Sequence, residues 1–222
     1  MTRRLIVIAI LLALPVASAH AAGIRGQLWL SDEAARYART GRVPSAAAAL
    51  QQREASDAVV YVETIPDKAE KKLVKPHWFF AKKPPMVRLV QSGRRFVPRI
   101  LAVPAGARVQ LENLDLVYHN AFSVSPAKRF DLGKYPPGRI DTLSFDRAGI
   151  INLHCDIHPE MVGFVVVVPN HEFTRPDSTG AFVLPGLPEG RYTMCAWHPR
   201  RGERRVAFEV LKRGDVNVAV RY

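Results

Sequence analysis

The chain has 222 residues, of which 48% are hydrophobic and 23% are charged. This composition excludes a wholly disordered chain, and the length allows one large or two small domains. The 32 Lys and Arg residues outnumber the 20 Asp and Glu residues, giving a formal net charge of +12. The 17 Pro and 14 Gly residues, among many short Val, Ile and Phe runs, favour strands and turns over a helical bundle.

The first 21 residues have the features of an export signal. Arg3 and Arg4 precede the apolar run 5–14, which is too short to span a bilayer, and small residues follow it. Cleavage is expected after Ala21, with Ala19 as the alternative. We therefore expect a periplasmic or secreted protein without a membrane span. An exported protein rarely meets nucleic acid, so the positive charge indicates an acidic partner or a solvated basic face.

The region after the signal is expected to contain two strands with helices between them. The strands are predicted over residues 23–30 and 58–63. Ser31 can cap a helix over residues 32–40, because a serine hydroxyl accepts from the free N–H groups of the first turn. A second helix is predicted to begin at Pro44 and to run to residue 52.

A candidate metal site lies between two strand-like runs within residues 150–168. It reads Cys155-x-x-His158-x-x-Met161, and His119 supplies a second imidazole upstream. A thiolate, an imidazole and a thioether form a soft ligand set, which suits copper rather than magnesium or calcium. Two His and one Cys with a weak axial Met form the blue-copper arrangement.

Each of these residues also has an ordinary structural interpretation. His119 alone would be a surface or core residue, and Met161 would be a packing residue. Cys155 could instead form a structural disulfide with Cys195. His154 precedes Cys155 on a strand, so its side chain is expected on the opposite face, and we do not predict it as a ligand.

A series of short motifs surrounds the candidate ligands between residues 86 and 169. In chain order they are Gly93-x-x-Phe96-x-Pro98, Val103-x-Ala105-Gly106, Asn113, His119-Asn120, Phe130-Asp131-x-Gly133, Ala148-Gly149 and the ligand loop. This stretch resembles a cupredoxin of the plastocyanin/amicyanin type. The loop is especially similar to that of amicyanin, since plastocyanins place two more residues between the His and the Met. The resemblance implies a Greek-key β-sandwich in which His119, Cys155, His158 and Met161 bind one type 1 copper ion.

The same resemblance implies a one-electron carrier that cycles copper between Cu(I) and Cu(II), and not an enzyme. Asn120 would join the two ligand loops by hydrogen bonds, and His158 would be the electron exit near the surface. Amicyanin-like proteins accept electrons from quinoprotein amine dehydrogenases and pass them to c-type cytochromes, so a redox partner of this kind is expected. The alternatives are a copper storage or delivery protein and a cell-envelope interaction module with a structural copper site.

The C-terminal part contains Asp-x-x-Gly-x-Phe followed by Leu-Pro-x-Gly-x-Tyr within residues 177–192. This pattern is similar to that of the carboxypeptidase regulatory-like (transthyretin-like) sandwich module. Its strands are predicted over residues 181–184, 191–197, 206–210 and 216–220. His198, at a strand end, is expected at the surface.

The first strands of that module are expected far upstream. Residues 22–66 and 170–222 would then form one discontinuous sandwich, residues 67–85 a basic linker, and residues 86–169 an inserted cupredoxin domain. The alternative is an N-terminal extension followed by two consecutive domains. In either case the predicted class is all-β with minor helix near the N-terminus.

Overall fold

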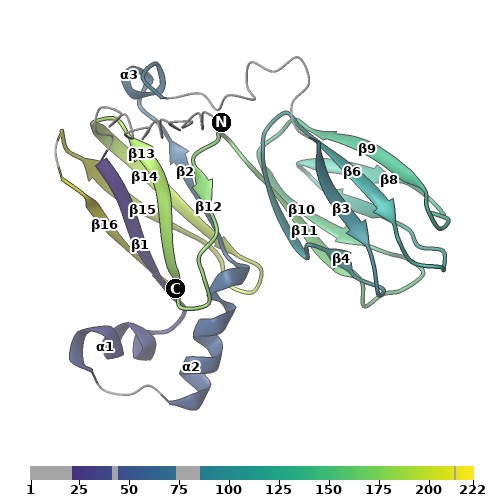
Figure 1. Cartoon of the computed structure of the whole chain (residues 1–222), viewed down its shortest axis with the longest axis horizontal. Coiled ribbons are helices and arrows are strands. Elements are labelled where there is room, and N and C mark those ends of the chain that lie inside the picture. The colour runs from purple at the N-terminus through teal and green to yellow at the C-terminus, as the bar shows by residue number, and fades with distance from the viewer. Residues whose placement is uncertain (1–21, 42–44, 74–85, 213) are drawn as a thin grey trace, which may run out of the picture.

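The computed structural model of the chain describes residues 22–41, 45–73, 86–212 and 214–222. In these ranges the chain is mostly strand, arranged as two β-sandwiches with a few short helices (Figure 1). The predicted all-β class with minor helix is therefore confirmed. The predicted signal, residues 1–21, and the linker residues 74–85 lie outside the described residues. None of the described helices is both long enough and apolar enough to cross a membrane.

Strands from both ends of the chain form one of these sandwiches, here called the outer sandwich. Its two sheets have the strand orders β13-β1-β16 and β12-β2-β14-β15. The strands are β1 (Ala22–Trp29), β2 (Val59–Thr64), β12 (Phe173–Thr174), β13 (Ala181–Leu187), β14 (Gly190–His198), β15 (Gly202–Val210) and β16 (Val216–Arg221). β1 pairs antiparallel with β13 and parallel with β16, and β2 pairs antiparallel with β12 and β14. The apolar residues that face inward from both sheets form one core.

Residues 87–168, between β2 and β12 in the chain, form the inner sandwich. Its sheets have the orders β5-β11-β10-β7-β8 and β4-β3-β6-β9. The strands are β3 (Val87–Gln91), β4 (Phe96–Val97), β5 (Ile100–Pro104), β6 (Ala107–Asn113), β7 (Phe122–Ser125), β8 (Lys128–Asp131), β9 (Ile140–Phe145), β10 (Gly149–His154) and β11 (Val162–Val168). Alternate residues, as in β6, point into a second core that includes Cys155 and Met161.

A third apolar cluster joins the two sandwiches. Its fully or nearly buried members are Val59, Tyr61, Ile100, Val166, Val168, Cys195 and Trp197. The rings of Phe164 in the inner sandwich and Trp197 in the outer one lie 5.3 Å apart between centroids. An ion pair between Arg99 and Asp57, 3.0 Å long, also crosses the interface. β2 therefore has apolar surroundings on both faces, which explains its unbroken Val-Val-Tyr-Val run.

The helices lie at both ends of the outer sandwich: α1 (Asp32–Thr40), α2 (Ala46–Arg53) and a 3₁₀ turn (Glu54–Asp57) at one end, and α3 (Asp67–Glu70) at the other (Figure 1). As predicted, the hydroxyl of Ser31 caps α1, accepting from Ala34 N at 3.2 Å. α2 begins at Ala46 with Ser45 as its N-cap, whereas Pro44 lies outside the described residues.

The expectation that His198 lies at the surface is wrong. The residue is 1% exposed, and its Nε2 lies 3.1 Å from the carbonyl oxygen of Glu54. The backbone N–H of Arg200 donates to Nδ1 at 3.3 Å, so both ring nitrogens have partners. The segment after α2 covers this strand end, and no local pattern in the sequence of β14 predicts that contact.

The alternative of a structural disulfide is excluded. Cys155 and Cys195 are both free and both buried. Cys155 belongs to the core of the inner sandwich, whereas Cys195 lies in the cluster between the sandwiches. Burial raises the pKa of the Cys195 thiol to about 11, so this residue is an unreactive packing thiol.

Candidate metal centre

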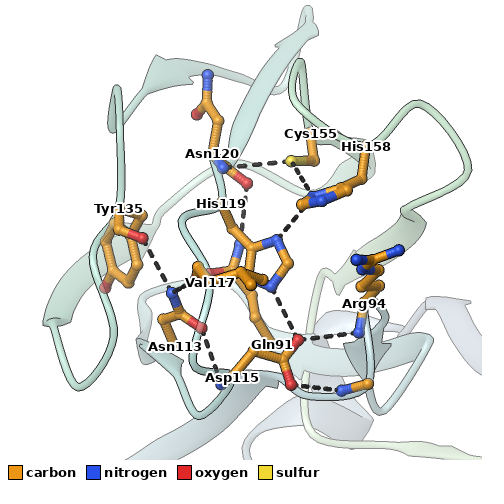
Figure 2. A network of polar contacts seen from close by, with 11 residues as sticks. Gln91, Arg94, Asn113, Asp115, Val117, His119, Asn120, Tyr135, Cys155 and His158 are labelled. Atoms are coloured by element: carbon orange, nitrogen blue, oxygen red, sulfur yellow. Dashed lines mark hydrogen bonds and ion pairs between the residues drawn. The ribbon is translucent and has the colours of Figure 1, made fainter.

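Three of the four predicted ligands converge on one point of the inner sandwich. The ligand atoms of His119, Cys155 and His158 all lie within 4.8 Å of one another (Figure 2). Nδ1 of His119 is 3.0 Å from Nδ1 of His158, which in turn is 3.9 Å from Sγ of Cys155. His119 and Cys155 are 36 positions apart in the sequence. Together with His158 they present two nitrogens and one sulfur to the same small volume.

The backbone around His119 is held by two neighbours. His119 and Tyr135 exchange both backbone hydrogen bonds, at 3.1 and 2.7 Å. The side-chain amide of Asn113, at the end of β6, donates to the carbonyl oxygens of Val117 and Tyr135, each at 2.9 Å. These bonds keep the loop after β6 folded over the sandwich, so that the fully buried His119 ring points at Cys155 and His158.

The other nitrogen of the His119 ring is bound to a carboxylate that the sequence analysis missed. Oδ2 of Asp115 lies 2.8 Å from Nε2 of His119. The backbone N–H groups of Gly93 and Arg94 donate to the same carboxylate at 2.7 and 2.9 Å (Figure 2). The only sequence signal was an acidic residue four positions before the histidine.

The ionisation of Asp115 follows from these contacts. Burial acts to raise its pKa, but hydrogen bonds from Arg94, the His119 ring and Gly93 outweigh burial and hold the pKa below its usual range. An ionised Asp115 accepts the Nε2 proton, which leaves the Nδ1 lone pair of His119 free to bind a metal.

Cys155 follows β10 and its sulfur is buried. The backbone N–H of Asn120 donates to Sγ at 3.2 Å. The expected link between the two ligand loops is therefore made by the main chain of Asn120. The side-chain amide nitrogen of Gln91 adds support, since it donates to the Asn120 carbonyl oxygen at 2.9 Å. An N–H directed at sulfur stabilises a thiolate and limits its charge donation.

Met161 lies in the same core cluster as Cys155 and is fully buried. Its backbone N–H donates to the carbonyl oxygen of His158 at 2.9 Å, which closes the short loop into a tight turn. The structure therefore places Met161 beside the loop of the other candidates, and thioether ligation by this residue stays a prediction.

The two histidines predicted as ligands differ in surroundings. His158 is half-buried, whereas His119 is wholly enclosed. The ring of His154 lies against Phe122, with centroids 5.7 Å apart, and is not among the converging groups.

The donor atoms themselves test whether a metal fits. The Nδ1 atoms of His119 and His158 face each other at 3.0 Å with a sulfur nearby, and two unprotonated nitrogens in that position repel unless a proton or cation lies between them. Two imidazoles and one thiolate form a set that copper or zinc accepts and that magnesium and calcium do not. The residues therefore fit the predicted copper ion.

No protein-family model and no curated protein matches this chain. Among solved structures it is similar to a copper-containing nitrite reductase from Thermus scotoductus SA-01, at 25% identity and a TM-score of 0.39 over 49% of this chain. This chain spans only 28% of that enzyme.

Two smaller proteins are also similar to this chain. A purple cupredoxin from Nitrosopumilus maritimus aligns at 25% identity over 36% of this chain and 98% of its own, with a TM-score of 0.33. An oxidized amicyanin mutant aligns at 25% identity over 37% of this chain and 81% of its own, with a TM-score of 0.35.

Proposed function

We propose that this chain is an exported mononuclear blue-copper protein that carries single electrons, with His119, Cys155, His158 and Met161 as its copper ligands. The observation that carries the proposal is the convergence of two imidazoles and one thiol within 4.8 Å, one imidazole buried and the other half-exposed. A bound copper ion would supply the Cu(I)/Cu(II) couple at this point.

The surrounding residues support rapid electron transfer because they restrict movement of the ligands. His119 is held through both its backbone and its Nε2, and the sulfur of Cys155 through the N–H of Asn120. A site that changes little between oxidation states has a small reorganisation cost, which is what a carrier needs. The same enclosure disfavours copper delivery, since a donor protein must release its metal.

The loops that carry the two histidines expose large apolar side chains. The exposed residues are Leu114, Leu116, Val117, Tyr118 and Ile157, and Leu116 is 94% exposed. Large apolar side chains exposed on the loops of a functional site indicate a surface that another protein covers. We propose that a redox partner, a c-type cytochrome or a quinoprotein dehydrogenase, docks here and exchanges electrons through His158.

The physiological setting that we propose is periplasmic, with amine oxidation as the source of electrons. Among the basic residues at positions 200–205, two are paired with acids and so contribute less to the electrostatic steering of an acidic partner. Arg200 pairs with Glu54 at 2.8 Å, and Arg205 pairs with Glu63 and Glu203, each at 2.8 Å.

We further propose that the outer sandwich is a regulatory-like module that supports the inner one.

The test is spectroscopy of the full chain loaded with Cu(II). We expect an intense visible thiolate-to-Cu(II) band, a narrow copper hyperfine splitting in the EPR spectrum, and reversible bleaching by one electron per chain. Cys155→Ser should remove the band, whereas Cys195→Ser, at the other buried cysteine, should keep it. A wild-type protein without the band, or a Cys155→Ser protein that retains it, would contradict the proposal.

A further inference from the structure

A pocket of about 270 Å³ opens on the inner sandwich beside the ligand loop. It is lined by Arg95, Phe96, Arg99, Glu160, Met161 and Val162. Phe96 and Met161 are almost fully buried, so they form an apolar floor, while the charged residues form the rim. The pocket therefore combines apolar contact with charges of both signs.

The two arginines of the rim differ in their partners. Arg99 is occupied, because its guanidinium pairs with Asp57 at 3.0 Å and lies over the ring of Phe164, 5.5 Å from the centroid. Within the described part of the chain, the side chain of Arg95 has no ion pair or hydrogen bond. The guanidinium donors of Arg95 are therefore free to bind a ligand in the pocket that this residue lines.

Glu160 is the acidic residue of the pocket rim, and like Arg95 it has no partner among the described residues. Its carboxylate does not pair with Arg95 although both residues line the pocket. The two groups are therefore too far apart to pair directly. A ligand that carries a negative and a positive group can satisfy both, whereas a simple anion or cation would meet a like charge.

We propose that this pocket binds a small zwitterion, an α-amino acid with an apolar side chain. Its carboxylate pairs with the guanidinium of Arg95, which is suited to two parallel N–H···O bonds, and its ammonium group pairs with Glu160. The side chain packs against Phe96 and Val162. This inference goes beyond electron transfer, because binding needs no metal.

The position of Met161 gives a direct readout of binding. Met161 lines the pocket, whereas Met194 lies in the core of the outer sandwich. In the metal-free full chain labelled with ¹³C-methyl methionine, L-leucine should shift the Met161 methyl resonance saturably and leave that of Met194 in place. Leucine should bind about tenfold more tightly than glycine, since its side chain buries additional apolar surface.

Matched ligands and variants separate this site from a plain ion site. The compound 4-methylpentanoate lacks the ammonium group of leucine and 3-methylbutylamine lacks the carboxylate, and each should bind at least tenfold more weakly than leucine. Arg95→Gln and Glu160→Gln should weaken leucine binding by a similar factor. Arg129→Gln, which removes an exposed arginine on β8 at the far edge of the sheet, should leave it unchanged.

Three results would overturn the inference: no saturable shift of Met161, equal affinity for leucine and 4-methylpentanoate, or unchanged binding in both pocket variants. None of them affects the visible band expected from Cys155, so failure here is distinguishable from failure of the copper proposal.

Discussion

The carboxylate of Asp115 lies 2.8 Å from Nε2 of His119, whose ring is wholly buried. The same carboxylate accepts from two consecutive backbone N–H groups of the turn after β3. One side chain thus connects the buried histidine to a strand pair that contributes no metal ligand. It determines which nitrogen of His119 faces the metal position, and it keeps the ring from turning.

Replacing Asp115 by Asn should weaken copper binding about 10- to 100-fold, the usual effect of removing a partner of a ligating histidine. The amide keeps the size of the side chain but removes the charge that favours a proton on Nε2. Competition titration with a chelator measures the affinity. Asp131→Asn is the control, because Asp131 also accepts a backbone N–H, from Gly133 at 2.8 Å, but is exposed and away from the site. Equal affinities in both variants would show that Asp115 is only structural.

The turn before β13 depends on glycine at position 180. Gly180 has φ +89°, and a Cβ there would lie 2.1 Å from the carbonyl oxygen of Leu28. Gly202 has φ +71° with open space around it. Gly202→Ala is therefore the control, because it introduces the backbone strain of a positive φ without a steric clash. We expect Gly180→Ala to lower the free energy of unfolding by about 1–3 kcal/mol more than Gly202→Ala. Urea denaturation provides the comparison, and equal losses would contradict the packing argument.

His198 should make stability depend on pH. Burial holds its pKa below the ordinary value of 6.5, although the hydrogen bond to Glu54 partly opposes this. Below pH 6.5 the unfolded chain therefore binds more protons than the folded one, and the free energy of unfolding should fall as the pH falls. His171, whose pKa burial also lowers, acts in the same direction.

The variant His198→Gln tests this dependence because it removes the titrating ring and keeps a side-chain donor. Urea denaturation at pH 7.5 and pH 5.5 should show a smaller loss of stability in the variant than in the wild type. Part of the loss of stability at low pH should persist in the variant because His171 is still present. An identical loss in both proteins would mean that His198 does not contribute.

The apolar cluster between the sandwiches should make them unfold together. Trp197 is buried there against Phe164, so Trp197→Ala should cost about 3–5 kcal/mol. Calorimetry should then resolve two transitions where the wild type has one. Val183→Ala, at an exposed position of β13, should change stability by no more than about 0.5 kcal/mol. A single unshifted transition in Trp197→Ala would show that the interface is weak.

Much of the local structure could be predicted from the sequence, because its signals are short-range. The strands near both ends of the chain lie within four residues of their predicted bounds, and most within one, since alternating apolar residues and turn residues determine them. The ligand loop could be recognised for the same reason. Cys155, His158 and Met161 occupy one tight turn, so their spacing alone brings them together.

The remaining features required the tertiary structure, because they depend on contacts between distant segments. The carboxylate of Asp115 reaches His119 only because the loop after β6 folds back against the turn at residues 93–94. His198 is buried because the segment after α2 crosses the end of β14. The resemblance already grouped residues 22–66 with residues 170–222 in one sandwich, but the strands with which β1 and β2 pair, and their register, appear in no local pattern. Periodicity shows which face of a strand is apolar, but it does not show which other segment will cover that face.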